Sequence, residues 1–251
     1  MRKCASTDSA RREKRKSTLG KEYRIWLCKE RTVMGITEQQ NKIFNELRKI
    51  NPGIIDDGVV DETEYTSVLY RIMYVLKEVN GGLGWSLCKH LKNGGRQQVH
   101  DATWDNIARW TEGILSLPNE LAWSQLENAC EKRRERMLPK ICAVNVKKTA
   151  GSYTSDSKQI YVEALNNAEI LKKQLELYSP HIVICCGTEK AFVDACYPKQ
   201  RIKWQMTTRG VWYFMHDSKI IISFSHPAAR VKDCYLYYAL MDAVREILKM
   251  K

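Results

Sequence analysis

The sequence predicts a three-layer α/β/α domain whose central sheet has four strands and is mostly parallel. Four apolar segments rich in β-branched residues have the pattern of buried strands, and they cover residues 68–76, 141–146, 181–186 and 220–225. Segments with helical spacing of apolar residues separate them. Strands that alternate with helices are typical of a parallel sheet covered on both faces, so the class is α/β.

The helices and the domain limits follow from the same periodicity. Apolar residues recur at helical spacing between residues 20 and 50, and further helices are predicted over 103–117, 121–137, 158–178 and 233–250. Residues 1–16 carry seven Arg and Lys against Asp8 and Glu13. We therefore predict a disordered basic arm over residues 1–18 and one α/β domain over 19–251, of which 19–66 is an N-terminal helical part.

Composition narrows the function classes. The net charge of +12 favours a polyanionic partner such as nucleic acid. No apolar run approaches the roughly 20 residues that a membrane helix needs, and the charged start of the chain does not resemble a signal peptide, so a cytoplasmic protein is expected. The nine cysteines contain no C-x-x-C pair, so neither a metal site nor any other cofactor is predicted.

Polar residues follow each of the four predicted strands. The turns after them are Lys77-Glu78-Val79-Asn80, Asn145-Val146-Lys147-Lys148, Gly187-Thr188 and His226-Pro227. Carboxyl ends of parallel strands meet at one edge of the sheet, where open α/β sheets bind their ligands. Since proline fixes φ and ends the last strand, His226 is expected at that edge, where it can donate to an oxygen that becomes anionic.

The order of these motifs resembles the uracil-DNA glycosylase superfamily, most closely its iron–sulfur-containing branch. The resemblance covers residues 141–251, nearly half of the chain. The family's Asn-Val-Val-Lys-Cys strand end is similar to Asn145-Val146-Lys147-Lys148, and its Gln-Leu-Glu-Leu-Ile-x-Pro segment to residues 174–180. Its Leu-Gly-x-x-Ala turn resembles residues 186–191, and its Arg-Gly, hairpin, strand and His-Pro series resembles residues 209–227.

Two departures from the family accompany the resemblance. The iron–sulfur cysteines are absent, so no cluster is expected. The family's first motif is Gly-Gln-Asp-Pro-Tyr or Gly-x-Asn-Pro-Gly, whereas this chain has Lys77-Glu78-Val79-Asn80-Gly81-Gly82. The family's first motif therefore does not identify which residue of this chain would activate water.

The resemblance implies three catalytic or base-reading residues. His226 would donate to the O2 atom of a pyrimidine; the alternative is a structural histidine. Glu78 would orient water or offset charge on the sugar, with Asn80 as its rival and a surface glutamate as the alternative. Asn145 falls where the family reads the edge of a flipped base, and a turn-forming asparagine is the alternative.

Further residues are predicted to surround the base or the DNA. Trp85 can stack on a base or pack in the core, Asp105 can line the cleft or cap a helix, and Gly187 belongs to the third strand-end turn. Phosphate contacts are predicted for Lys147, Lys148, Arg230 and Lys232, each of which is alternatively a solvated surface charge.

These roles predict a DNA glycosylase that hydrolyses the N-glycosidic bond of a base in double-stranded DNA. Glycines 81 and 82 stand where uracil-specific enzymes place a tyrosine that excludes C5 substituents, so the expected substrate is a C5-hypermodified pyrimidine of phage DNA, removed in antiviral defence. The alternatives are a uracil or mismatch repair glycosylase, an inactive DNA-binding member, and a nucleoside hydrolase.

A lyase step would need an amine nucleophile. Lys77 and Lys147 lie near the predicted cleft, but the sequence gives neither a feature that favours it, and a monofunctional enzyme is expected. The sequence predicts no membrane partner and leaves the oligomeric state open.

Overall fold

The computed structural model describes residues 34–79, 84–95, 101–128, 130–151, 155–198 and 200–249, and the statements below concern these residues. The predicted basic arm over residues 1–18 lies outside them, as does the part of the N-terminal helical segment before residue 34. Residues 36–251 belong to one compact unit.

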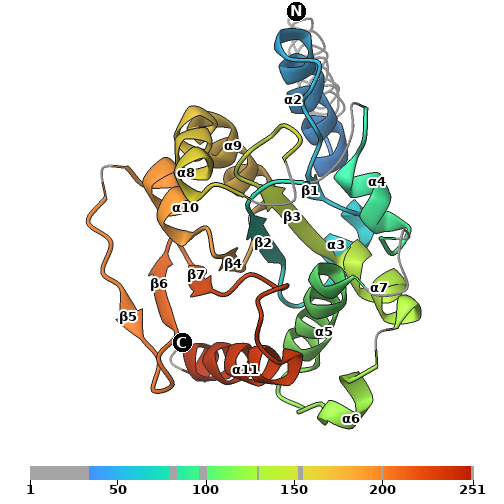
Figure 1. Cartoon of the computed structure of the whole chain (residues 1–251), viewed down its shortest axis with the longest axis vertical. Helices are drawn as coiled ribbons and strands as arrows, with labels where there is room; N and C mark the ends of the chain where they lie inside the picture. Colours follow the sequence, from blue (N-terminus) through green and yellow to red (C-terminus); the bar gives the residue numbers. More distant parts are fainter. Residues whose placement is uncertain are drawn as a thin grey trace, which may run out of the picture. The chain divides into compact units, whose positions relative to one another are not determined.

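A mixed sheet forms the centre of this unit (Figure 1). Across the sheet, its described strands are β1 (Gly58–Val59), β3 (Ile141–Asn145), β2 (Ile72–Leu76), β4 (Ile182–Cys186), β7 (Lys219–Phe224), β6 (Trp212–His216) and β5 (Gln205–Met206). The α/β class is confirmed. The prediction of a four-stranded sheet is wrong, since the sheet has seven strands in the described residues.

The error concerns the edges of the sheet. Strands β3, β2, β4 and β7 are mutually parallel, and they are the four segments whose continuous apolar pattern predicted strands. Strands β1, β6 and β5 pair antiparallel at the two edges. β1 and β5 have two residues each, and β6 has exposed residues at Trp212 and Met215, so these strands lack the run of buried residues that marks a central strand.

The register of the parallel strands brings their carboxyl ends to one level. Leu76 of β2 lies opposite Asn145 of β3, and Cys186 of β4 lies opposite Phe224 of β7. The turns that follow these four strands therefore lie side by side at one edge of the sheet, as the sequence predicts.

Helices cover both faces of the sheet. The first face packs against α4 (Leu87–Lys92), α5 (Ala102–Ser116), α7 (Glu131–Met137) and α11 (Asp233–Lys249), with α6 (Trp123–Leu126) beside them. The second face packs against α8 (Ser157–Asn166), α9 (Ala168–Tyr178) and α10 (Glu189–Cys196) (Figure 1). Each central strand alternates its side chains between these two cores, so the three-layer arrangement is confirmed.

Two helices and one short 3-10 turn complete the description. Helix α2 (Ile36–Ile50) contacts α9 and β1, α3 (Glu62–Ser67) precedes β2, and a 3-10 turn (Leu138–Lys140) precedes β3. The predicted helix over 158–178 is two helices, because Asn167 ends α8 and begins α9, and that over 121–137 is split into α6 and α7. Within the described ranges, no helix is long and apolar enough to cross a membrane.

A buried ion pair joins the segments around the end of β3. The Lys148 ammonium donates to both carboxylate oxygens of Asp57, at 3.0 and 2.8 Å, and to Oε1 of Gln174 at 2.7 Å. The Lys148 side chain is 1% exposed, and burial lowers its pKa while Asp57 opposes that shift. The prediction that Lys148 contacts a DNA phosphate is wrong, because its three N–H groups are already used inside the protein.

We expect Lys148→Met to lower the free energy of unfolding by about 3–5 kcal/mol, because it leaves the Asp57 carboxylate buried without its cation. Urea denaturation measures this loss. Lys172→Met is the matched control: Lys172 pairs with the exposed Glu169, and the expected loss is below about 1 kcal/mol. Equal losses in the two variants would show that the buried pair stabilises the fold no more than the exposed pair of Lys172 and Glu169 does.

Candidate functional site

Backbone hydrogen bonds join the strand ends in two pairs, β2 with β3 and β4 with β7. The turn after β3 lies along the turn after β2: Val146 N–H donates to Leu76 O, and Lys147 N–H donates to Lys77 O, each at 3.0 Å. On the other side, Gly187 N–H after β4 donates to Phe224 O of β7 at 2.8 Å. These bonds fix the backbone from which the candidate site residues project.

The hydrogen bonding of His226 defines which nitrogen carries its proton. Nδ1 accepts the backbone N–H of Ala228 at 3.1 Å, so in the neutral imidazole the proton is on Nε2. Burial, and then the positive charge of Lys77, lower the pKa of His226 below its ordinary value of 6.5. No hydrogen bond of the described residues involves Nε2. At neutral pH His226 therefore presents an unpaired N–H donor.

A buried polar cluster holds the turn that carries His226. The Asn106 side chain of α5 donates from Nδ2 to Pro227 O at 2.8 Å and to Asp233 Oδ1 at 2.9 Å. Arg109 donates to Asn106 Oδ1 at 2.8 Å and to Asp233 Oδ2 at 3.0 Å. Because α5, the turn and the start of α11 share these bonds, the backbone beside His226 has little freedom to move.

Asn145 is the last residue of β3, and its side chain is almost wholly buried, with the residue 2% exposed. Its backbone N–H donates to Asp57 Oδ2 at 2.7 Å. Its side-chain Oδ1, however, is buried and has no hydrogen-bond partner among the described residues. An unpaired buried acceptor costs about 1–3 kcal/mol, and functional sites are where such groups persist.

Glu78 and Lys147 form an ion pair between the turns after β2 and β3. Lys147 Nζ donates to Glu78 Oε2 at 2.7 Å, and the two side chains are 10% and 6% exposed. The Glu78 carboxylate lies directly against Gly151, where a Cβ would collide with it. Only Oε2 is hydrogen bonded within the described part of the chain, so Oε1 remains available. The prediction that Lys147 contacts a DNA phosphate is wrong, because its side chain is buried and paired with Glu78, and it is not a solvated surface cation either.

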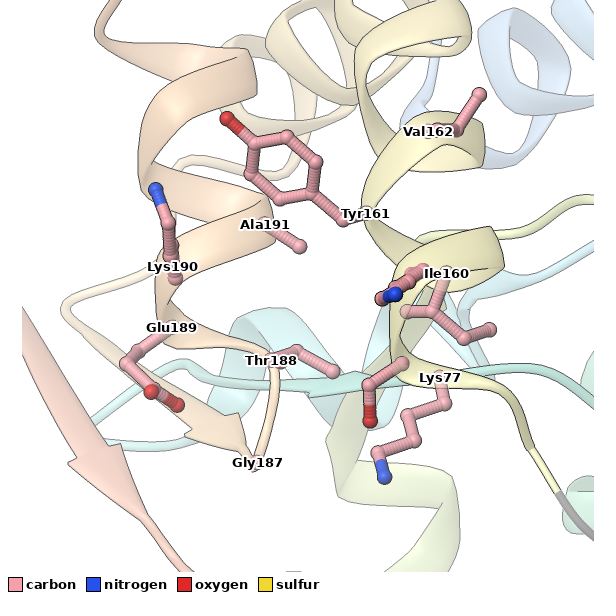
Figure 2. A pocket seen from close by; sticks show the side chains of 11 residues that line it. Lys77, Ile160, Tyr161, Val162, Gly187, Thr188, Glu189, Lys190 and Ala191 are labelled. Atoms are coloured by element: carbon pink, nitrogen blue, oxygen red, sulfur yellow. The ribbon is translucent and has the colours of Figure 1, made fainter.

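A cavity of about 480 Å³ opens on the second face of the sheet, between α8 and α10 (Figure 2). Tyr161 and Lys190 line its upper part, and Lys77, Gly187 and Thr188 line the part nearest the strand ends (Figure 2). Gly187 has φ of 68°, which favours glycine, and its missing side chain leaves space beside Cε of Lys77. No carboxylate pairs with Lys77 in the described ranges.

Two predicted base-contacting residues have structural roles instead. The Asp105 carboxylate is buried in α5, pairs with the buried Arg134 of α7 and accepts the N–H of Asp101, so its predicted place in the pocket is wrong. Trp85 packs against the core on the first face, with its ring centroid 5.1 Å from that of His90. Asn80, the rival of Glu78, lies outside the described residues.

The segment after His226-Pro227 is exposed. Arg230 and Lys232 both reach the surface, and Val231 between them is 48% exposed. Two cations thus flank an exposed apolar side chain, and among the described residues neither cation's side chain forms a hydrogen bond or an ion pair. Their phosphate contacts stay a prediction.

Sequence analysis missed the residues that support the site. Asp57 is one of several acidic residues in a polar stretch, and it meets Lys148 only after 91 positions of chain. The bond from Asn106 to Pro227 likewise joins positions 121 residues apart. No local pattern marks such pairs. The one usable signal is the presence of a polar residue on the apolar face of a helix.

Comparisons with known proteins assign no family. A scan of the chain against protein-family models found no match, and a search of curated proteins found none either.

We expect Asn106→Ala to lower the free energy of unfolding by about 1–3 kcal/mol, because Arg109 and Asp233 lose a shared partner inside the protein. Amide hydrogen exchange at Ala228 should accelerate at the same time, since the turn loses its anchor at Pro227 O. Asn41→Ala, at an exposed position of α2, is the control and should change stability by less than about 0.5 kcal/mol. Unchanged exchange at Ala228 would contradict the anchoring role.

We expect the pKa of His226 to lie below 6.5 and to rise in Lys77→Gln, because that variant removes a nearby positive charge and leaves the burial. An NMR titration of the imidazole measures this, with His226→Gln to assign the resonance. The control Lys190→Gln should leave the pKa unchanged. Because the folded pKa is depressed, the stability due to neutral His226 is full above pH 6.5 and is lost as the pH falls through the folded pKa.

Proposed function

We propose that the protein is a DNA glycosylase, which flips a base out of double-stranded DNA and hydrolyses its N-glycosidic bond. The substrate we propose is a C5-hypermodified pyrimidine, such as glucosylated hydroxymethylcytosine of phage DNA, and the abasic product would serve antiviral defence. The resemblance of residues 141–251 to uracil-DNA glycosylases and the arrangement of the strand-end turns support this proposal.

The state of His226 is the observation that carries the proposal. Cleavage of the N-glycosidic bond leaves negative charge on the departing base, and a donor fixed at the base oxygen stabilises that charge. A neutral imidazole whose Nε2–H is unpaired, on a turn held by Asn106, is a donor of this kind. Because its position is fixed before the substrate binds, no reorganisation is needed when the charge develops.

Asn145 supplies the second contact to the base in this proposal. Strands β3 and β7 are separated by β2 and β4, so their axes are roughly 14 Å apart at the usual spacing between strands. The side chains of Asn145 and His226 take up part of this distance, and a pyrimidine ring with one hydrogen bond to each of them fits the remainder. The unpaired Oδ1 of Asn145 would accept an N–H of the base, which relieves the cost of burying it alone.

Glu78 is proposed to orient the attacking water through Oε1, while Lys147 fixes the carboxylate through Oε2. The exposed Arg230 and Lys232 and the net charge of +12 support binding to the DNA backbone. The preference for a bulky C5 substituent rests on glycines 81 and 82 of the sequence, which replace the excluding tyrosine of the uracil-specific enzymes.

One observation favours a second candidate, a DNA-binding protein without glycosylase activity. Lys147 pairs with the Glu78 carboxylate, and a carboxylate whose charge is already compensated offsets less positive charge on a sugar. This candidate keeps the DNA contacts and the base pocket, and it differs from the first in producing no free base.

The test is mass analysis of bases released from matched duplexes that contain uracil, a thymine mismatch, hydroxymethylcytosine or its glucosylated form. We expect release from the glucosylated duplex, and a loss of about 10²–10³-fold in rate for His226→Ala, because the fixed donor to the base oxygen is gone. Lys173→Ala, at an exposed position of α9, is the control and should act like the parent.

Each other outcome identifies an alternative. Release of uracil alone would contradict the proposed substrate and support a repair glycosylase. Binding of the duplexes without release of any base would support the inactive DNA-binding protein. Equal rates for His226→Ala and the parent would exclude the proposed role of His226.

A further inference from the structure

The lysines at the carboxyl edge of the sheet differ in their partners. Lys147 is paired with Glu78, and Lys148 is buried against Asp57 and Gln174. Lys77 is half-buried at the wall of the cavity in Figure 2, and no carboxylate or hydrogen-bond acceptor pairs with it in the described parts of the chain. It is therefore the amine at this edge that is free to act on a ligand.

We propose that Lys77 is an amine nucleophile that forms a Schiff base with the C1′ aldehyde of an abasic site in DNA, which gives the protein an abasic-site lyase activity. The proposal rests on the proposed function in one respect: both place the sugar of a DNA nucleotide at this edge of the sheet. It replaces the expectation of a monofunctional enzyme.

The geometry places the amine beside the proposed leaving-group donor. Cε of Lys77 and the backbone nitrogen of His226 lie 3.9 and 4.0 Å from one point, the position that a Cβ on residue 187 would occupy. Residue 187 is glycine, so that space is open. If Nε2 of His226 contacts O2 of the base, C1′ is only three bonds from the contacted atom, along O2–C2–N1–C1′. In this proposal the sugar binds on the side of His226 that Lys77 and the open space at Gly187 line.

The chemistry uses only the abasic sugar and water. The neutral amine of Lys77 adds to the C1′ aldehyde, and the carbinolamine loses one water to form the imine. A proton then leaves C2′ to water, the C3′–O3′ bond breaks, and the 3′ strand departs with its phosphate. Hydrolysis of the imine consumes one water, which balances the water released when the imine formed, and frees Lys77 and the unsaturated sugar aldehyde. No oxidant, reductant or metal is needed.

Lys190 lines the same cavity but has a different electrostatic setting. Its ammonium pairs with Asp194 at 2.7 Å, and this carboxylate raises the pKa of Lys190. Since only the neutral amine attacks an aldehyde, Lys190 is the less reactive of the two. The cavity thus contains its own matched control.

Borohydride trapping on preformed abasic DNA tests the proposal. The full-length protein is mixed with a labelled duplex that already contains one abasic site, and sodium borohydride reduces any imine to a stable covalent adduct. We expect an adduct with the parent protein, mapped by peptide mass analysis to Lys77. Lys77→Arg keeps the positive charge but lacks the primary amine, so its adduct should be at least about tenfold weaker.

The controls separate this proposal from folding and from base excision. Lys190→Arg should form as much adduct as the parent, and thermal denaturation checks that each variant is folded. Because the abasic site is supplied ready-made, the assay does not depend on release of any base by this protein. Absence of an adduct from the parent, or undiminished trapping in Lys77→Arg, would overturn the lyase proposal and leave the glycosylase proposal standing.

Discussion

The buried pair of Asp57 and Lys148 is the interaction on which the rest of the site depends. Its carboxylate also accepts the backbone N–H of Asn145, and its ammonium also donates to Gln174 of α9. One charged pair therefore connects the segment before β1, the end of β3 and a helix of the second face. A buried pair is costly unless every partner is satisfied, and here the surrounding amides satisfy it. Lys147 lies between Asn145 and Lys148, and both of these bond to Asp57, so the same interactions position the turn that carries Lys147.

A second polar cluster plays the same part at the other side of the four parallel strands. Asn106 and Arg109 of α5 meet Asp233 at the start of α11, and the cluster ends on the carbonyl of Pro227. The two clusters hold β3 and β7, the outer strands of the parallel group, while backbone bonds join the ends of β2 and β3 and the ends of β4 and β7. The candidate site is thus held at both sides, and His226 is oriented before any ligand binds.

Much of the fold could be predicted because each central strand is a continuous run of apolar residues. An amphipathic helix has apolar residues on one face only, and a loop is polar, so neither produces such a run. The edge strands β1 and β5 could not be predicted, because a strand of two residues is too short to show a periodic pattern. Among the site residues, those at the ends of strands were located correctly, since strand order alone brings them to one edge. Lys148 and Asp105 were misassigned for a common reason: a charged residue gives no local sign of whether its partner is water or a distant opposite charge.

The sequence by itself determined the α/β class, the four parallel strands and the edge at which their turns meet, because these follow from apolar pattern and proline placement. Only the tertiary structure decided which charged side chains are paired and which are free. Lys147 and Lys77 are equivalent in sequence terms, but Lys147 pairs with Glu78, whereas Lys77 lies near His226 and pairs with no carboxylate of the described residues. Charge pairing depends on contacts between turns far apart in the chain, and such contacts exist only in the folded state.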